Sequence, residues 1–121
     1  MAFTRDELDL IERRKLVRIE TSNPGAAVHR TTIWAVVDGD YVFVRSWRGA
    51  GARWYREAVA NSEVAIHVGK VRLPARATVA VDPDSIARTS ACFERKYAGD
   101  PASGSMVRPE ILDTTLRIDG A

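Results

Sequence analysis

Sulfur and imidazole side chains are scarce in this sequence, which contains one cysteine, Cys92, and two histidines, His29 and His67. A single thiol cannot form a disulfide within the chain, and these few ligands cannot build a structural zinc site. We therefore expect neither disulfides nor metal ions to hold the fold, and we interpret Cys92 as a buried, inert thiol. The two histidines have no partner at catalytic or metal-ligand spacing, so we assign them no role.

Long hydrophobic runs are also missing. The longest apolar stretches, such as residues 33–37, are far shorter than the ~20 residues needed to cross a bilayer. The first six residues are neither basic nor apolar enough for a signal peptide. We therefore expect a cytoplasmic protein without a membrane partner.

An excess of charge of one sign is missing as well. The formal net charge of +2 is too small for the broad basic surface of a nucleic-acid-binding protein. Four arginines nevertheless lie within twelve residues: Arg45, Arg48, Arg53 and Arg56. Such a local cluster favours a small anionic ligand, and the alternative interpretation is a solvated face with surface ion pairs.

The composition is that of a globular chain. Its 121 residues are 45% hydrophobic and 28% charged, which suits one core, so we expect a single domain over residues 1–121. Six segments have the residue pattern of strands: 16–21, 31–37, 41–47, 64–68, 71–81 and 114–118. Asp38-Gly39-Asp40 predicts a hairpin between the second and third. Helices do not link every strand pair, so the strands must pair mainly antiparallel, and closure into a barrel would protect their edges.

Three helices are expected. Thr4 and Glu7 form a capping box, which predicts a helix from Arg5 to about Arg14. A second helix follows residues 49–51 and ends near residues 61–62. Asp82 is a good N-cap for a third helix, which begins at residue 83 and stops at residue 99.

Residues 45–56 combine several features of phosphate-binding sites. They join the end of a predicted strand to the start of a predicted helix, where backbone N–H groups are unpaired and carry partial positive charge. Gly49 and Gly51 allow an anion to approach the backbone, although they have an alternative use in forming the turn. The arginines offer planar forks to phosphate oxygens, and Ser46 adds a hydroxyl donor.

The hairpin extends this candidate site. Counting outward from its turn places Thr31 and Thr32 roughly opposite Ser46 and Trp47. Three tryptophans lie in or beside the same elements: Trp34, Trp47 and Trp54. They could form walls for a planar ring, and the alternative interpretation is that they belong to the core.

This arrangement resembles the FMN-binding split-barrel superfamily, which includes pyridoxamine-phosphate oxidases and deazaflavin-dependent reductases, and more narrowly the DUF2255 family. The resemblance runs from about Arg30 to Lys70 and rests on the hairpin 32–46, on Arg48-Gly49, on residues 53–56 and on residues 60–61. It implies an α+β fold, a six- to seven-stranded antiparallel split β-barrel with two to three flanking helices. It also implies a homodimer with the cofactor at the subunit interface.

The resemblance further implies that the start of the first hairpin strand and the end of the second bind the flavin phosphate and ring edge. Together with the arginine cluster, it gives ten candidate cofactor-binding residues: Arg30, Thr31, Thr32, Arg45, Ser46, Trp47, Arg48, Gly49, Arg53 and Trp54. In this hypothesis three arginines hold the phosphate, namely Arg45, Arg48 and Arg53. Trp47 or Trp54 borders the ring.

The first functional hypothesis is therefore an oxidoreductase-like protein that binds FMN or the deazaflavin F420, with an unknown substrate. The cofactor carries the hydride chemistry, so no catalytic residue is assigned. The alternative is a non-catalytic binding or sensing module for a small anionic ligand or haem on the same barrel. A third possibility is a structural dimer without a ligand.

Overall fold

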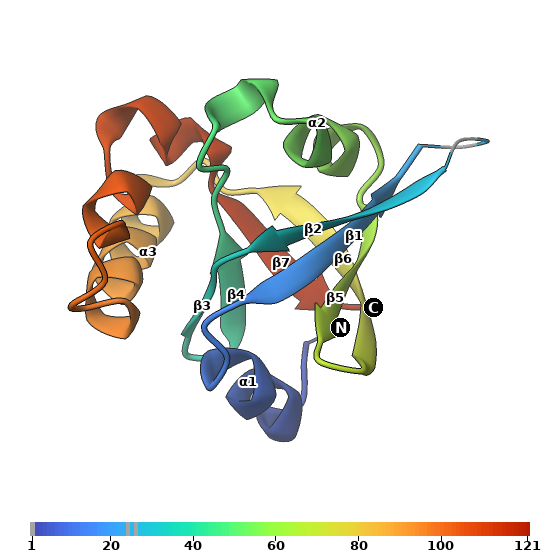
Figure 1. The fold of residues 1–121 in the computed structure, drawn as a ribbon, viewed down its shortest axis with the longest axis horizontal. Coiled ribbons are helices and arrows are strands. Elements are labelled where there is room, and N and C mark those ends of the chain that lie inside the picture. Colours follow the sequence, from blue (N-terminus) through green and yellow to red (C-terminus); the bar gives the residue numbers. More distant parts are fainter. Residues whose placement is uncertain (1, 24, 26) are drawn as a thin grey trace.

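The computed structural model of the protein describes residues 2–23, 25 and 27–121. Within these residues the elements, in chain order, are α1 (Arg5–Glu12), β1 (Val17–Ser22), β2 (Val28–Ile33), β3 (Ala35–Asp38), β4 (Tyr41–Val44), the 3-10 helix η1 (Gly49–Gly51), α2 (Arg53–Ala60), β5 (Glu63–Val68), β6 (Val71–Val79), α3 (Pro83–Lys96), the 3-10 helices η2 (Ser103–Met106) and η3 (Pro109–Thr114), and β7 (Leu116–Gly120). The described strands form one curled antiparallel sheet in the order β2-β1-β5-β6-β7-β4-β3 (Figure 1). The predicted α+β split barrel with flanking helices is confirmed.

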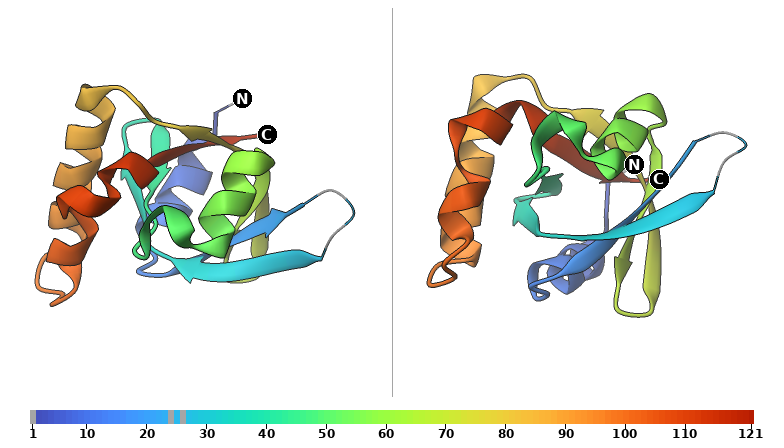
Figure 2. Two further views of the ribbon diagram at one scale, coloured as in Figure 1. Left: turned by 90° about the horizontal axis from the view of Figure 1, so that it is seen from above. Right: turned by 45° about the horizontal axis from the view of Figure 1, so that its top comes forward.

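The three α-helices cover different sides of this half-barrel. α1 and α2 lie at opposite ends of the sheet, and α3 stands beside β3 and β4 (Figure 1). Figure 2 shows the same separation of α3 and a β1–β2 hairpin that projects from the body. Among the described residues, no helix has the length and apolarity needed to span a membrane.

α1 begins with the predicted capping box. The Thr4 hydroxyl accepts a hydrogen bond from the Glu7 N–H, and the Glu7 carboxylate accepts one from the Thr4 N–H, at 3.2 and 2.8 Å. Leu8 and Ile11 are buried in the barrel interior, so the short apolar stripe of the helix closes one barrel end. The helix ends at Glu12, slightly before the predicted Arg14.

The predicted strand 31–37 is wrong as a single element, because the chain changes partners at Trp34. β2 pairs with β1, with Thr31 opposite Ile19 and Thr32 opposite Arg18. β3 pairs instead with β4. β2 and β3 are therefore the two edges of the curled sheet, and the single residue between them crosses the opening of the barrel. The expected pairing of Thr31 and Thr32 with Ser46 and Trp47 is wrong for the same reason, and β4 already ends at Val44.

The other predicted strands are present with shifted ends. Asp38 pairs with Tyr41 across a turn in which Gly39 has φ +62°, so the predicted hairpin is confirmed as β3–β4. β6 ends at residue 79, not 81. β7 lies between β6 and β4 and starts at Leu116, because Thr114 belongs to η3. The sequence favours a loop over residues 100–109, which are rich in glycine, proline and serine, and the structure has η2 within it.

Two apolar cores hold these layers together. The larger fills the barrel and includes Ile19, Ile66 and Ile118, which are fully buried. The smaller lies between the outer face of the β3–β4 hairpin and α3 and includes Phe43 and Phe93. The second core explains how a helix outside the barrel is fixed against it.

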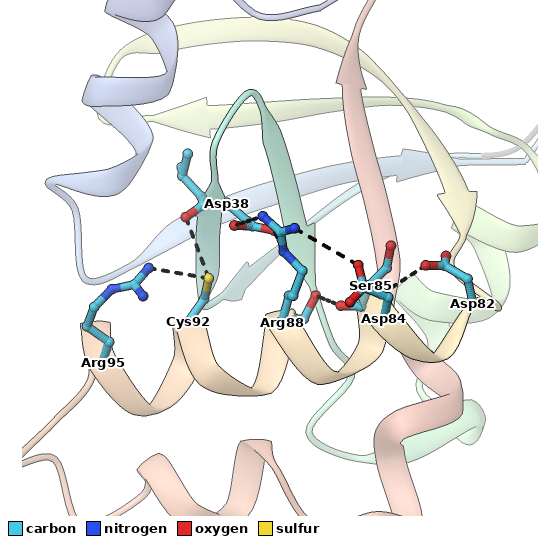
Figure 3. Close-up of polar contacts among 9 residues, drawn as sticks. Asp38, Asp82, Asp84, Ser85, Arg88, Cys92 and Arg95 are labelled. Carbon is cyan, nitrogen blue, oxygen red and sulfur yellow. Dashed lines mark hydrogen bonds and ion pairs between the residues drawn. The ribbon is translucent and has the colours of Figure 1, made fainter.

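α3 starts at the predicted cap, and an ion pair joins it to β3. The Asp82 carboxylate accepts a hydrogen bond from the Ser85 N–H at 2.9 Å. Arg88 donates two hydrogen bonds, at 2.8 and 3.1 Å, to the carboxylate of Asp38 at the end of β3 (Figure 3). One turn further along, Cys92 is buried, and this burial raises the pKa of its thiol, as expected for an unreactive cysteine.

Candidate functional site

A cavity of about 380 Å³ opens where the β2–β3 junction meets the segment after β4 and the η2 region. Its lining residues are Leu16, Thr31, Thr32, Ile33, Trp34, Arg45, Trp47, Arg48, Ala52, Trp54, Ala102, Ser105 and Met106. Six of the ten predicted site residues are among them: Thr31, Thr32, Arg45, Trp47, Arg48 and Trp54. The structure therefore brings most of the predicted residues to one place, although by a different strand pairing.

Aromatic and aliphatic side chains form most of the wall. The ring of Trp34 is stacked on Tyr97, with centroids 3.9 Å apart and planes 6° apart. Trp54 is buried and belongs to the barrel core as well as to the cavity wall. Trp47 is 56% exposed. Its orientation is fixed because the indole N–H donates to the Ser105 hydroxyl at 3.0 Å.

Arg45 is a buried arginine with an exposed fraction of only 1%. Its guanidinium makes four hydrogen bonds, all to neutral acceptors. Nε donates to the Thr115 hydroxyl, Nη1 to the Ser90 hydroxyl and the Met106 carbonyl, and Nη2 to the Ile86 carbonyl, at 2.7 to 3.1 Å. The side chain thus ties β4 to α3, to η2 and to the start of β7.

The charge of Arg45 has no carboxylate partner within the described part of the chain, although its guanidinium lies over the ring of Phe93, 5.6 Å from the centroid. Burial lowers its pKa to about 10, which leaves the guanidinium charged at neutral pH. No ion pair within 4.0 Å involves it among the described residues, and the cavity lining holds two arginines but no carboxylate. A guanidinium has five N–H donors, of which Arg45 uses four on the protein. The cavity therefore has a positive wall.

The start of α2 adds donors beside this wall. Arg48 lines the cavity, is exposed, and makes no hydrogen bond or ion pair to the described residues. Gly49 has φ +80° and makes the turn into η1, which confirms its turn-forming use. Ala52 is the N-cap of α2 and offers no side-chain acceptor, so the first N–H groups of this helix stay available to an anion.

Four predicted site residues do not line the cavity: Arg30, Ser46, Gly49 and Arg53. Ser46 is buried, and its hydroxyl donates to the Gly49 carbonyl at 2.6 Å, so it fastens the turn. Arg30 is on the outer face of β2, 3.7 Å from the Glu20 carboxylate. Arg53 is exposed at the first position of α2, close to the cavity residues Ala52 and Trp54.

Sequence reasoning missed the contribution of residues 102–106 to the cavity. Ala102, Ser105 and Met106 line the cavity, and the Met106 carbonyl accepts a hydrogen bond from the cavity residue Arg45. It also missed Arg108, whose guanidinium lies 5.7 Å from the ring of Trp47 and donates to the backbone carbonyls of Trp47 and Ser105. These residues lie in a segment that the sequence marks only as a loop, so no periodicity or motif signalled their role.

Several solved structures share this fold. HutZ, the haem storage protein from Vibrio cholerae, superposes with a TM-score of 0.71 at 14% identity, covering 100% of this chain and 92% of that protein. The F420-H2 dependent reductase FDR-A gives 0.66 at 14% identity, covering 88% and 95%. A pyridoxamine 5′-phosphate oxidase-like protein from Listeria innocua gives 0.63 at 14% identity, covering 96% and 90%. At this identity the likeness shows a common fold.

A comparison with curated proteins finds no significant match. The model of one protein family does match, over residues 7–118, and therefore over nearly all of the barrel, the cavity and the flanking helices. This family is described as an uncharacterized protein conserved in bacteria. The chain belongs to the DUF2255 family.

Proposed function

We propose that this protein binds a flavin-type cofactor, FMN or F420, and serves as an oxidoreductase-like protein. The planar ring would occupy the cavity between Trp34, Trp47 and Trp54, and the anionic part would lie toward Arg45 and Arg48. The observation that carries the proposal is the buried charge of Arg45, which lines the cavity without a carboxylate partner among the described residues.

A buried charge without a counter-charge destabilises a protein. Taking a cation out of water is unfavourable by several kcal/mol unless an opposite charge or a full set of hydrogen bonds compensates it. Arg45 has neutral acceptors for four of its donors, so its hydrogen bonds are largely satisfied while its charge is not. An anionic ligand in the cavity would supply a counter-charge beside Arg45 and Arg48.

The remaining lining fits such a ligand. A mostly apolar wall with a few polar groups is typical of cofactor sites, because the wall binds the ring and the polar groups fix its orientation. Thr31 and Thr32 provide such groups on one side. Arg48 and the uncapped start of α2, followed by the exposed Arg53, provide donors for a phosphate at the rim.

In this proposal the protein supplies binding and orientation. A bound flavin or deazaflavin would supply hydride transfer, which none of the lining side chains can perform.

Haem binding is a second candidate, because HutZ, a haem storage protein, shares the fold. An iron ligand would then be needed near the cavity. Among the lining residues only Met106 has a side chain that ligates haem iron, and it is buried in the second core. The nearest histidine, His29, lies outside the lining, two residues before Thr31 on β2, so haem would need a ligand from beyond the cavity wall.

We also propose that two copies of the chain close the cavity together. Leu16 and Trp47 line it and are both about half exposed, so a partner surface over the rim would bury apolar area that is otherwise in water. Size-exclusion chromatography with light scattering should give twice the mass of the chain. A monomer at all concentrations would contradict this part of the proposal.

The binding proposal is tested by titrating the protein with FMN, F420 and hemin while recording tryptophan fluorescence and the visible spectrum. Saturable quenching by FMN or F420 is the expected result, because the ring would lie against tryptophans. Arg48→Ala should weaken binding, and Arg30→Ala is the matched control, since this exposed arginine lies outside the cavity. A Soret band that saturates with hemin, without binding of FMN or F420, would replace the proposal with the haem alternative.

A further inference from the structure

A second polar cluster lies next to the cavity, between β2 and α2. His29, Thr31 and Ile33 alternate along β2 and face the same side, and the last two line the cavity. On α2, Glu57 follows the cavity residue Trp54 by one helical turn. His29 and Glu57 therefore contact each other next to the cavity wall. His29 precedes the cavity residue Thr31 on β2, and Glu57 follows the cavity residue Trp54 on α2.

Glu57 is a buried carboxylate with a full set of donors. It accepts hydrogen bonds from the Thr21 hydroxyl at 2.8 Å and from His29 Nδ1 at 3.1 Å, with Asn23 Nδ2 at 3.5 Å. Burial alone would raise the pKa of Glu57, but the hydrogen bonds from Thr21 and His29 outweigh it and lower the pKa below its usual value. Glu57 is therefore ionised at neutral pH.

An ionised carboxylate can only accept hydrogen bonds, so the His29 nitrogen that contacts it, Nδ1, must carry a proton. In the neutral ring the proton must be on Nδ1, which leaves the lone pair on Nε2. Nε2 has no partner among the described residues, and the side chain is 30% exposed. The other charged group near this pair is Arg53, one turn before Glu57 on α2, and β1 contributes the neutral Thr21.

The second histidine of the chain shows the opposite arrangement. His67 uses Nε2 for its hydrogen bond to the Glu20 carboxylate, at 2.7 Å, and its side chain is 10% exposed. The carboxylate thus contacts Nδ1 in His29 and Nε2 in His67, and the His29 side chain is the more exposed of the two. His67 is an internal control for any measurement on His29.

We infer that Glu57 and His29 form a carboxylate-supported imidazole base beside the cavity, whose Nε2 accepts a proton from an N–H or O–H group of the ligand seated there. Glu57 is the positioning residue, because it fixes the tautomer and the ring orientation of His29. The identity of the ligand rests on the proposed function, whereas the Nδ1–H tautomer of His29, with its lone pair on Nε2, does not.

The first part of the test uses the protein without ligand. Diethyl pyrocarbonate reacts at a free imidazole nitrogen: Nε2 attacks the carbonyl carbon, a nitrogen–carbon bond forms, and the ethyl carbonate that leaves decomposes to ethanol and carbon dioxide. Peptide mass spectrometry should show His29 modified several-fold faster than His67, because the His29 side chain is 30% exposed and the His67 side chain only 10%. Equal rates, or a faster His67, would overturn the inference.

Nitrogen NMR and two variants test the role of Glu57. In the wild-type protein the neutral His29 ring should be the Nδ1–H tautomer. Glu57→Gln should lower the modification rate of His29 and increase the Nε2–H tautomer, while Glu20→Gln is the matched control and should leave His29 unchanged. A wild-type ring that is protonated on Nε2 would contradict the inference even if the Glu57 variant fails to fold.

The second part adds FMN or F420 at saturation, with binding verified by tryptophan fluorescence. Modification of His29 should then slow several-fold, and that of His67 should not change. If the ligand binds and the His29 rate stays the same, His29 is not part of the ligand site and this inference fails. If neither cofactor binds, the proposed function fails, and the free-protein rates and tautomer alone decide whether the imidazole base exists.

Discussion

Replacing Arg45 by methionine should destabilise the protein, because one side chain joins four separated segments. Its acceptors belong to α3, η2 and the residue before β7. A hydrogen bond from a charged donor contributes roughly 1.5–3 kcal/mol, so four bonds contribute roughly 6–12 kcal/mol. Burying the guanidinium without a counter-charge destabilises the wild-type protein by several kcal/mol. Methionine fills a similar volume without a charge, so the variant avoids this penalty. We expect a net loss of about 2–4 kcal/mol.

The assay is thermal unfolding followed by circular dichroism. For a chain of this length 1 kcal/mol corresponds to about 4 °C, so Arg45→Met should lower the Tm by roughly 8–16 °C. Arg48→Met is the matched control, because Arg48 has no hydrogen bond to the described residues and surface changes usually stay within about 0.5 kcal/mol. If Arg45→Met melts within about 2 °C of the wild type, the guanidinium does not hold these segments together and the reasoning is refuted.

Two further predictions concern charges outside the cavity. Hydrogen bonds from Arg72 and His67 lower the pKa of Glu20 to about 2 although burial opposes them, so this carboxylate contributes stability above pH 4.5 that is lost as the pH falls toward 2. Denaturant unfolding between pH 6 and pH 2 should show roughly 2 kcal/mol of this loss, allowing for the exposure of Arg72, and Glu20→Gln should remove that part of the pH dependence. Asp82→Ala removes the cap of α3 and should cost about 1 kcal/mol in urea unfolding. An unchanged midpoint would show that Asp82 does not act as a cap.

The elements could be predicted where local chemistry determines them. The capping box at Thr4, the cap at Asp82 and the turn at Gly39 each depend on residues within a few positions of one another, and all three are present. The break at Trp34 could not be predicted in this way. Residues 31–37 form a continuous β-branched and aromatic run without glycine or proline, so nothing local indicates that the chain changes partners there.

The candidate site depends even more on contacts between residues far apart in the sequence, which local patterns do not reveal. The sequence places an arginine at the end of a strand, but not whether it points outward or into the protein, because that depends on where residues 86, 90 and 106 lie in space. Arg45 is therefore in the predicted place with a more buried environment than expected. His29 and Glu57 are 28 positions apart in the sequence, and only the packing of α2 on β1 and β2 brings them into contact.

The central claim is that the cavity binds a planar ring that carries a negative charge, and one comparison tests it directly. The dissociation constants of FMN and riboflavin, and of F420 and its phosphate-free deazaflavin, should be measured by fluorescence titration. A charge-assisted hydrogen bond to an arginine predicts that the phosphorylated member of a pair binds about tenfold more tightly or better. Equal affinities within both pairs, or no binding by any of the four compounds, would contradict the account.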